Sequence, residues 1–303
     1  RYDAGPGRAG MKLGVQLNSF DWSGGPERFG KNLADIGRVA EEAGFDRIGV
    51  ADHQWQHPIM NGPEANEPEC YTTLAFLAAN TDRIRLTAMV SGVHFRHPAV
   101  LVKVVSTLDV LSGGRACFGV GSGHYEEETL GLGIPFPPQR ERFEMLEETV
   151  QIALRMWHGE RGDERPYEGK HYRLGRPLNL PQSISRPHPP IMIAGDGERK
   201  TLRLVARYAD ACSLRPGQQV PGKLAVLRRH CEAEGRDYED IEKTCAFAFD
   251  VGESGEKVEE LIGQLRWLSG MGIETVIGFV PGVDRITPLE IIGRDVIPAV
   301  ADL

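Results

Sequence analysis

Polar residues and glycines follow the buried, apolar runs of this chain, directly after the point where each run ends. Asp52 and His53 follow one such run, and Ser91 and Gly92 follow the next. Histidine exchanges protons near neutral pH, and glycine lets a flat ligand or a phosphate group approach the backbone. If the runs are strands of one parallel sheet, their carboxyl ends meet at one edge, and the sequence predicts a ligand site there. The other residues in such positions are Gln16, Asn18, His94, His97, Gly121, Ser122, Gly123, His124, Gly195, Asp196, Gly197, Arg215 and Asp250.

The stretch from residue 83 to residue 125 contains the clearest strand, helix and strand pattern of the chain. Residues 84–90 and 116–120 are apolar runs, typical of strands whose two faces are both buried. Between them, Pro98 suits the first turn of a helix, and Gly113 with Gly114 ends it. The pattern predicts a parallel crossover unit, because two parallel strands need a long connection such as a helix.

The same alternation continues along the whole chain. Eight apolar runs, each followed by an amphipathic helix, match a closed eight-stranded barrel better than an open doubly wound sheet. We therefore predict an α/β fold of the (β/α)8 TIM barrel type. The predicted strands are 12–18, 47–51, 84–90, 116–120, 191–194, 211–214, 244–251 and 275–280.

Two segments fall outside this alternation. Residues 159–190 are rich in proline and predict a surface excursion between the fourth helix and the fifth strand, with a small hairpin around 168–170. Residues 1–10 are rich in Gly, Pro and Arg, and we interpret them as a disordered extension or a cloning remnant, with Met11 as a candidate natural start. Residues 11–303 are then predicted to form a single domain.

Composition argues against several classes of function. The chain has 303 residues and a net charge of −8, whereas general nucleic-acid binding needs a basic face. No apolar run approaches the ~20 residues that a membrane-spanning helix needs. The five cysteines are odd in number and show no Cys-x-x-Cys spacing, which predicts reduced thiols in a cytoplasmic protein.

The residues at the strand ends leave more than one kind of site open. A metal site would use His53, His94, His97, His124 and Asp250, but barrel metal hydrolases usually carry paired histidines on the first strand, where this chain has Gln16 and Asn18. Cofactor binding is therefore favoured, and no metal is predicted. The run 119–123 fails the dinucleotide fingerprint, because His124 stands where its third glycine is required. Residues 195–197 precede a helix and suit either an anion or a plain helix cap.

Longer motifs of the chain resemble the luciferase-like monooxygenase superfamily, and within it the type that uses the deazaflavin coenzyme F420. The resemblance extends from about residue 11 to residue 299. The motifs that carry it are 43–46 (AGFD), 52–53 (DH), 97–98 (HP), 107–115 (TLDVLSGGR), 119–123 (GVGSG), 133–136 (GIPF), 142–143 (RF), 193–199 (IAGDGER) and 206–210 (ARYAD).

The resemblance implies where the coenzyme would lie. Its ring would be backed by a bulge at 91–93, in which we predict a non-proline cis peptide, and its phosphate would lie at the loop 194–197. The chain departs from many relatives at Asp196, where they have glycine. A carboxylate beside a phosphate is unfavourable unless the carboxylate turns away. The implied cofactor-binding residues are Asp52, Ser91, Gly92, Val93, His97, Gly121, Ser122, Gly123, Ala194, Gly195, Asp196 and Gly197.

The resemblance also implies a site for the substrate. His53 matches a histidine held near the ring, where it would relay a proton or bind a substrate oxygen, and it is the predicted catalytic residue. Relatives often have tryptophan at His124, so the shape of the pocket is expected to differ here. The implied substrate pocket comprises Asn18, His94, His124 and Arg215.

The implied function is that of an F420-dependent oxidoreductase, which transfers a hydride between deazaflavin and a small organic substrate. Two alternatives stay open. One is an FMN-dependent monooxygenase that uses reduced flavin and O2, and the other is a deazaflavin-binding protein without catalytic activity. The resemblance further implies a homodimer and a separate flavin or F420 reductase for recycling, with neither a nucleic acid nor a membrane as partner.

Overall fold

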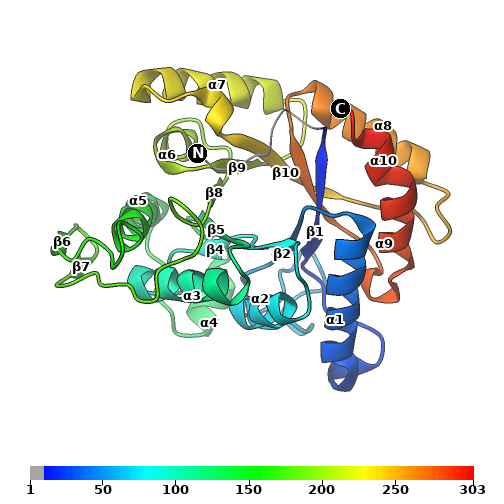
Figure 1. Cartoon of the computed structure of the whole chain (residues 1–303), viewed down its shortest axis with the longest axis horizontal. Coiled ribbons are helices and arrows are strands. Elements are labelled where there is room, and N and C mark those ends of the chain that lie inside the picture. The colour runs from blue at the N-terminus through cyan, green and yellow to red at the C-terminus, as the bar shows by residue number, and fades with distance from the viewer. Residues whose placement is uncertain (1–9) are drawn as a thin grey trace.

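The computed structural model describes residues 10–303, and eight parallel strands close into a barrel at its centre (Figure 1). The barrel strands are β1 Lys12–Leu17, β2 Arg47–Val50, β3 Arg85–Ala88, β5 Ala116–Gly121, β8 Ile191–Ala194, β9 Ala211–Leu214, β10 Glu242–Ala248 and β11 Thr275–Phe279. β1 pairs with β2 and β11, and the ring runs on through β10, β9, β8 and β5. It closes between β5 and β3, where Ala116 lies opposite Leu86. The predicted TIM-barrel fold is confirmed.

Helices surround the barrel and bury one face against it (Figure 1). In α1 the buried residues include Leu33, Ile36 and Ala40, at helical spacing, and the helix ends at Gly44 with φ of 93°. The helices are α1 Gly25–Ala43, α2 Cys70–Ala79, α3 Pro98–Leu111, α4 Glu126–Gly131, α5 Gln139–Met156, α6 Thr201–Tyr208, α7 Val220–Glu234, α8 Val258–Gly270, α9 Thr287–Ile291 and α10 Ile297–Val300, with a π-helical turn at 292–296.

The proline-rich excursion lies between α5 and β8, as predicted, outside the barrel (Figure 1). It contains an antiparallel hairpin of β6 Tyr167–Glu168 and β7 Arg173–Leu174. Buried carboxylates fasten the excursion to the helices beneath it. Glu148 of α5 accepts backbone N–H groups of residues 170–172, and Asp109 of α3 accepts those of residues 184 and 185.

The chain between β3 and α3 differs from the prediction. A two-residue strand, β4 Ser91–Gly92, pairs with β5 at its carboxyl end. The cis peptide predicted within 91–93 is wrong in position, because the non-proline cis bond joins Met89 to Val90. The β3 ladder ends at Ala88, so the chain leaves its regular path ahead of β4 rather than within it.

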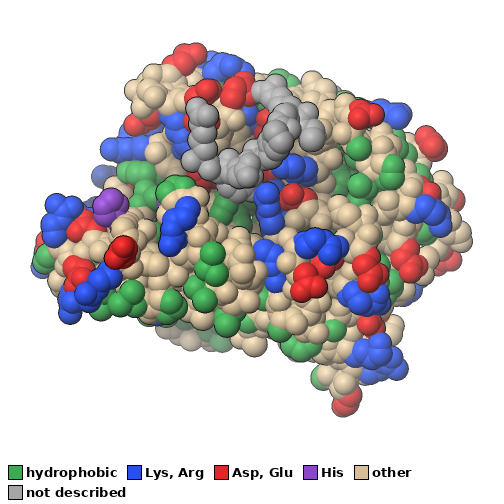
Figure 2. Space-filling model, viewed as in Figure 1, with side chains coloured by type: hydrophobic (Ala, Val, Ile, Leu, Met, Phe, Trp, Pro, Cys, Tyr) green, Lys and Arg blue, Asp and Glu red, His purple; other side chains and the backbone are tan. Residues whose placement is uncertain are grey.

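The remaining expectations concern thiols, membranes and the terminus. All five cysteines are buried and free. Within residues 10–303, every helix is too short or too polar to cross a lipid bilayer. Figure 2 shows basic and acidic side chains interspersed over the viewed face. The amino-terminal extension lies outside the described residues, apart from Gly10.

Candidate active site

An imidazole and a buried carboxylate meet at the carboxyl end of the barrel. His53 follows β2, and its Nδ1 lies 2.9 Å from Oε2 of Glu128, on α4 after β5. The Glu128 side chain is fully buried, whereas that of His53 is 18% exposed. A hydrogen bond to a carboxylate keeps the proton of a neutral imidazole on Nδ1, and Nε2 is then free to accept a proton. The pair is therefore arranged as an oriented general base.

Glu128 also holds the loop on which His53 lies. Its carboxylate accepts the backbone N–H groups of Gln54 and Trp55, the latter at 3.0 Å. Burial alone would raise the pKa of Glu128, but the hydrogen bonds from His53 and from these two N–H groups lower it below its ordinary value. Glu128 is consequently ionised at neutral pH, as the orientation of His53 requires.

Asp52, next to His53, joins two of the loops at this end. It is buried, and Arg96 donates two hydrogen bonds to it, at 2.6 and 3.0 Å. Arg96 also donates to Glu69, at 2.6 Å. Such a two-pronged bond has a fixed geometry. It therefore fixes the loop after β2 against the segment between β4 and α3.

His94 explains two of the glycines in the predicted turns. A Cβ atom on Gly92 or Gly123 would lie only 2.6 or 2.2 Å from the His94 ring. Gly123 also has φ of 77°, which favours glycine. Burial, followed by the charge of Arg142, lowers the pKa of His94 to about 4, so this ring is neutral at pH 7. Its Nε2 lies 3.0 Å from the hydroxyl of Thr129.

Arg142 of α5 holds the glycine turn after β5 in place. It donates to the carbonyl oxygens of Ser122 at 3.0 Å, Gly123 at 3.5 Å and Pro137 at 2.5 Å. Its guanidinium group lies 3.8 Å from the centre of the Phe136 ring. The motifs GVGSG, GIPF and RF thus meet at one place in the fold.

Two further histidines and a tyrosine lie beside His53. The ring of His124 is 5.4 Å from that of His53 and 5.2 Å from that of His57, between ring centres. The ring of Tyr125 is 5.0 Å from that of His57. Burial and the neighbouring imidazoles lower the pKa of both His57 and His124. The rings of His57 and His124 are therefore neutral at neutral pH.

The loop between β8 and α6 is the predicted anion site. Gly195 has φ of 121°, which favours glycine. Asp196 accepts two hydrogen bonds from Arg215, at 3.0 and 2.9 Å, and this contact lowers its pKa. The carboxylate that departs from many relatives is therefore paired with a cation. A turn of residues 198–200 joins this loop to α6, and the N–H of Leu202 donates to the carbonyl oxygen of Gly197 at 3.0 Å.

Several buried polar atoms at this end of the barrel have no hydrogen-bond partner among the described residues. They are Asn18 Oδ1, Glu67 Oε1, His94 Nδ1 and the Tyr125 hydroxyl. Buried polar atoms in folded proteins are nearly always paired, so such atoms indicate the place of a ligand or water. Burial, followed by the nearby carboxylates of Glu128 and Asp52, raises the pKa of Glu67 to about 8.

Some of the predicted residues have contacts away from the cluster. His97 caps α3 by accepting the N–H of Ala99, and its ring lies 5.6 Å from that of Tyr172 in the excursion. Asp250 is paired with Lys257 at 2.6 Å. In the part of the chain that the structure describes, no group of three or more His, Cys, Asp or Glu side chains is placed to hold a metal ion.

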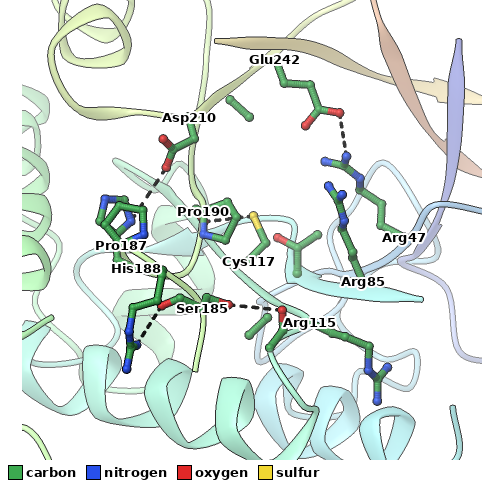
Figure 3. A pocket seen from close by; sticks show the side chains of 15 residues that line it. Arg47, Arg85, Arg115, Cys117, Ser185, Pro187, His188, Pro190, Asp210 and Glu242 are labelled. Atoms are coloured by element: carbon green, nitrogen blue, oxygen red, sulfur yellow. Dashed lines mark hydrogen bonds and ion pairs between the residues drawn. The ribbon is translucent and has the colours of Figure 1, made fainter. Parts of the chain in front are cut away.

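A cavity of about 220 Å³ lies at the opposite, amino-terminal end of the barrel (Figure 3). Its lining includes Arg47, the first residue of β2, and Glu242, the first residue of β10, which form an ion pair at 2.7 Å. Asp210 and His188 face each other across it at 4.0 Å. Because these polar groups pair with one another, we interpret the cavity as part of the amino-terminal end of the barrel core.

The sequence did not reveal Glu128, His57 or Tyr125 as site residues. Glu128 is the third residue of an acidic run, a pattern that is usually exposed, and nothing in the run distinguishes the buried member. His57 follows His53 by four residues, but in a loop this spacing places no side chain. The only signal available was position in the chain, because each of the three lies within eight residues of a predicted strand end.

Comparisons with known proteins give the family and the fold to which this chain is similar. Residues 11–290 match the model of the luciferase-like monooxygenase family. A relative from Kineococcus radiotolerans, named F420-dependent glucose-6-phosphate dehydrogenase, is 31% identical over 243 residues, which cover 77% of this chain and 66% of the relative. Among the first curated relatives, the chain spans 54% to 66% of their own length.

Solved structures share the whole fold. An F420-dependent secondary alcohol dehydrogenase, in complex with an F420-acetone adduct, superposes with a TM-score of 0.80 at 17% identity, over 97% of this chain and 100% of that chain. The EDTA monooxygenase of Chelativorans sp. BNC1 gives 0.79 at 15% identity, over 96% and 93%. At such identities the likeness establishes the fold and not the reaction.

Proposed function

The chain belongs to the luciferase-like monooxygenase family, and we propose that it is an F420-dependent oxidoreductase acting on a small organic substrate. The observation that carries this proposal is the His53–Glu128 pair, an oriented base at the carboxyl end of the barrel. The relatives named as F420-dependent dehydrogenases support the choice of coenzyme.

The residues at this end fit a deazaflavin coenzyme. The loop 195–197 at the start of α6 would hold a phosphate, since Arg215 already neutralises Asp196. Gly121 and Gly123 would let the coenzyme approach the backbone of the turn after β5, and β4 would lie behind the ring. The unpartnered atoms of Asn18 and Tyr125 suit a polar ligand.

When bound, the coenzyme supplies the group that accepts or gives the hydride. Nε2 of His53 takes the hydroxyl proton of an alcohol as the hydrogen on carbon leaves with its electron pair, and the C–O bond becomes a carbonyl. In the opposite direction His53 returns that proton. Glu128 keeps the ring in the required tautomer and stabilises the imidazolium that forms.

Titration with both coenzymes tests the proposal. We expect the fluorescence of oxidised F420 to change at lower protein concentrations than that of FMN, which means a lower Kd for F420. With F420 bound, we expect turnover of the substrate in the absence of oxygen. Gly197→Val should weaken F420 binding about tenfold, because a branched side chain shields the N–H groups at the start of α6. Tighter binding of FMN, with consumption of oxygen, would instead favour the FMN-dependent monooxygenase. Tight binding of F420 without turnover would favour a deazaflavin-binding protein without catalytic activity.

Replacing His53 separates its role from coenzyme binding. His53→Ala should keep the Kd for F420 within a few fold and lower kcat by about 10² to 10⁴, the usual contribution of a positioned acid or base. His158→Ala, at an exposed site just after α5, is the matched control. Unchanged turnover in His53→Ala would contradict the role, and loss of folding would indicate a structural one.

Three features of the working protein belong to the same proposal. We propose that it acts as a homodimer, that a separate F420 or flavin reductase recycles its coenzyme, and that it works in the cytoplasm. The five buried free thiols support a reducing compartment. Light scattering coupled to gel filtration tests the first feature, and a single-subunit mass would refute it.

A further inference from the structure

The imidazoles beside the proposed base form a binding surface of their own. The ring centres of His53, His57 and His124 lie 5.2 to 5.8 Å from one another. Two loops supply them, one after β2 and one after β5, and bring the three rings together, with His124 exposed and His53 and His57 half-buried. Tyr125 closes one side of the cluster, with its hydroxyl buried and unpartnered within the described residues.

The neutral rings offer hydrogen bonds in defined directions. Nδ1 of His57 accepts the backbone N–H of Ile59 at 3.2 Å, so its remaining proton lies on Nε2, which can donate. Neither ring nitrogen of His124 bonds to another of the residues 10–303, which leaves one donor and one acceptor for a ligand. The cluster can thus bind hydroxyl and carbonyl oxygens.

The charges around the cluster disfavour an anionic substrate. The two nearby arginines are engaged, Arg96 by the carboxylates of Asp52 and Glu69, and Arg142 by three backbone carbonyl groups. The nearest acidic group is Glu128, ionised directly beside His53. A phosphate dianion bound here would be repelled by the Glu128 carboxylate, and neither Arg96 nor Arg142 is unengaged to offset this repulsion. Binding of such a dianion would therefore cost free energy.

We propose that the substrate of this site is an uncharged hydroxy or carbonyl compound with a second oxygen near the reacting carbon, held by His57 and His124, rather than a phosphate ester. This inference rests on the proposed function, because His53 is taken to act at the first oxygen. Two oxygens on neighbouring carbons, each about 2.9 Å from a ring nitrogen, would span two rings whose centres are 5.2 Å apart. The site therefore differs in substrate class from what the relatives' names state.

Matched pairs of compounds test the inference with the F420-loaded protein. The first pair is glucose and glucose 6-phosphate, and the second is propane-1,2-diol and propan-2-ol. We expect at least a tenfold higher kcat/KM for glucose than for its phosphate ester, and for the diol than for the single alcohol. Ligand-induced shifts in Tm, measured with and without coenzyme, should rank the compounds in the same order without relying on turnover.

Variants at His124 locate the contact. His124→Phe should raise KM for the diol at least tenfold more than it raises KM for propan-2-ol. His124→Asn should recover part of this difference. His124→Arg should shift the preference toward the phosphate ester at least tenfold, because it adds an unengaged cation.

The outcomes separate the two proposals. Failure to bind F420 refutes the proposed function. If the protein binds F420 but prefers phosphate esters, or binds no neutral compound, the inference about the substrate is wrong and the proposed function stands. If His124→Phe weakens coenzyme and both alcohols alike, His124 is structural and the inference fails.

Discussion

The two ends of the barrel treat buried polar groups in opposite ways. At the amino end, Arg47 is nearly buried between Asp46 at 2.6 Å and Glu242 at 2.7 Å, and Thr275 donates to Glu242 as well. At the carboxyl end, Asp52 is paired with Arg96, but other buried oxygens and nitrogens remain unpartnered within the described residues. At the amino end, no unpartnered buried side-chain atom found among the described residues belongs to the lining of the cavity, and Figure 3 shows its labelled ion pairs.

The difference teaches that a cavity and a site are separate properties. A buried group that already has its partner stabilises the fold and has little to offer a ligand, whereas an unpartnered group costs free energy until something binds. The polar residues at one end should therefore contribute mainly to stability, and those at the other mainly to function.

The largest expected effect lies at the amino end. Arg47→Met leaves the Glu242 carboxylate buried without its cation, and we expect a loss of about 3–5 kcal/mol in the free energy of unfolding by urea. The double variant Arg47→Met with Glu242→Gln should recover part of this loss. The folded fraction should bind F420 as before. A loss below about 1 kcal/mol would show that the Arg47–Glu242 pair contributes no more to stability than a surface ion pair does.

A smaller effect is expected at the carboxyl end, on turnover. In Glu128→Gln the amide oxygen still accepts the loop N–H groups, but the NH2 group donates to Nδ1 of His53 and moves the ring proton to Nε2. We expect kcat to fall about 10²-fold, or ~2.7 kcal/mol, with a change in stability of under about 1 kcal/mol. If the variant loses stability but keeps its kcat, Glu128 contributes to stability rather than to function, contrary to the expected role of the carboxyl end.

The smallest effect is a difference in pH dependence. The pKa of Glu67 rises from 4.5 to about 8 in the folded protein, so its contribution to stability is present below pH 4.5 and is lost as the pH rises toward 8. Glu67→Gln should therefore gain stability relative to the wild type between pH 5 and pH 8. At the amino end the pKa of Glu242 is lowered, because Arg47 overcomes the effect of burial, and its contribution is lost instead as the pH falls.

Urea unfolding at pH 5, 7 and 9 measures this difference directly. The wild type and Glu67→Gln should have similar free energies of unfolding at pH 5 and diverge above it. Parallel curves across this range would mean that Glu67 is ionised in the folded state, and the carboxyl end would then hold its carboxylates as the amino end does.

The barrel could be predicted from the sequence because its signal is repeated and local. Strands such as 47–50 and 191–194 are short apolar runs buried on both faces, and each is followed by a helix with a single apolar stripe. Closure of the sheet follows from the number of units. The strand ends then give the rim of the site, which is why His53 and the loop 195–197 could be singled out.

The rest of the site depends on contacts that a single sequence does not encode. Helix α4 has no apolar periodicity, since it begins with Glu126, Glu127 and Glu128, so neither the helix nor the buried carboxylate was predicted. The cis peptide at Met89–Val90 was predicted too late in the chain, because the end of the β3 ladder is set by its neighbours. His57 lies near His124 because contacts between distant parts of the chain, such as those of Glu128 and Arg96, hold the loop after β2.

The three bonds that Glu128 makes have a consequence for how this protein can change over evolution. Active-site groups commonly trade stability for activity, so that a substitution which weakens one strengthens the other. Here one carboxylate both orders a loop backbone and orients His53, the proposed base. Selection for stability and selection for turnover therefore act on position 128 in the same direction. Substrate preference can then vary through neighbours such as His124, whose ring nitrogens hydrogen-bond to none of the other described residues.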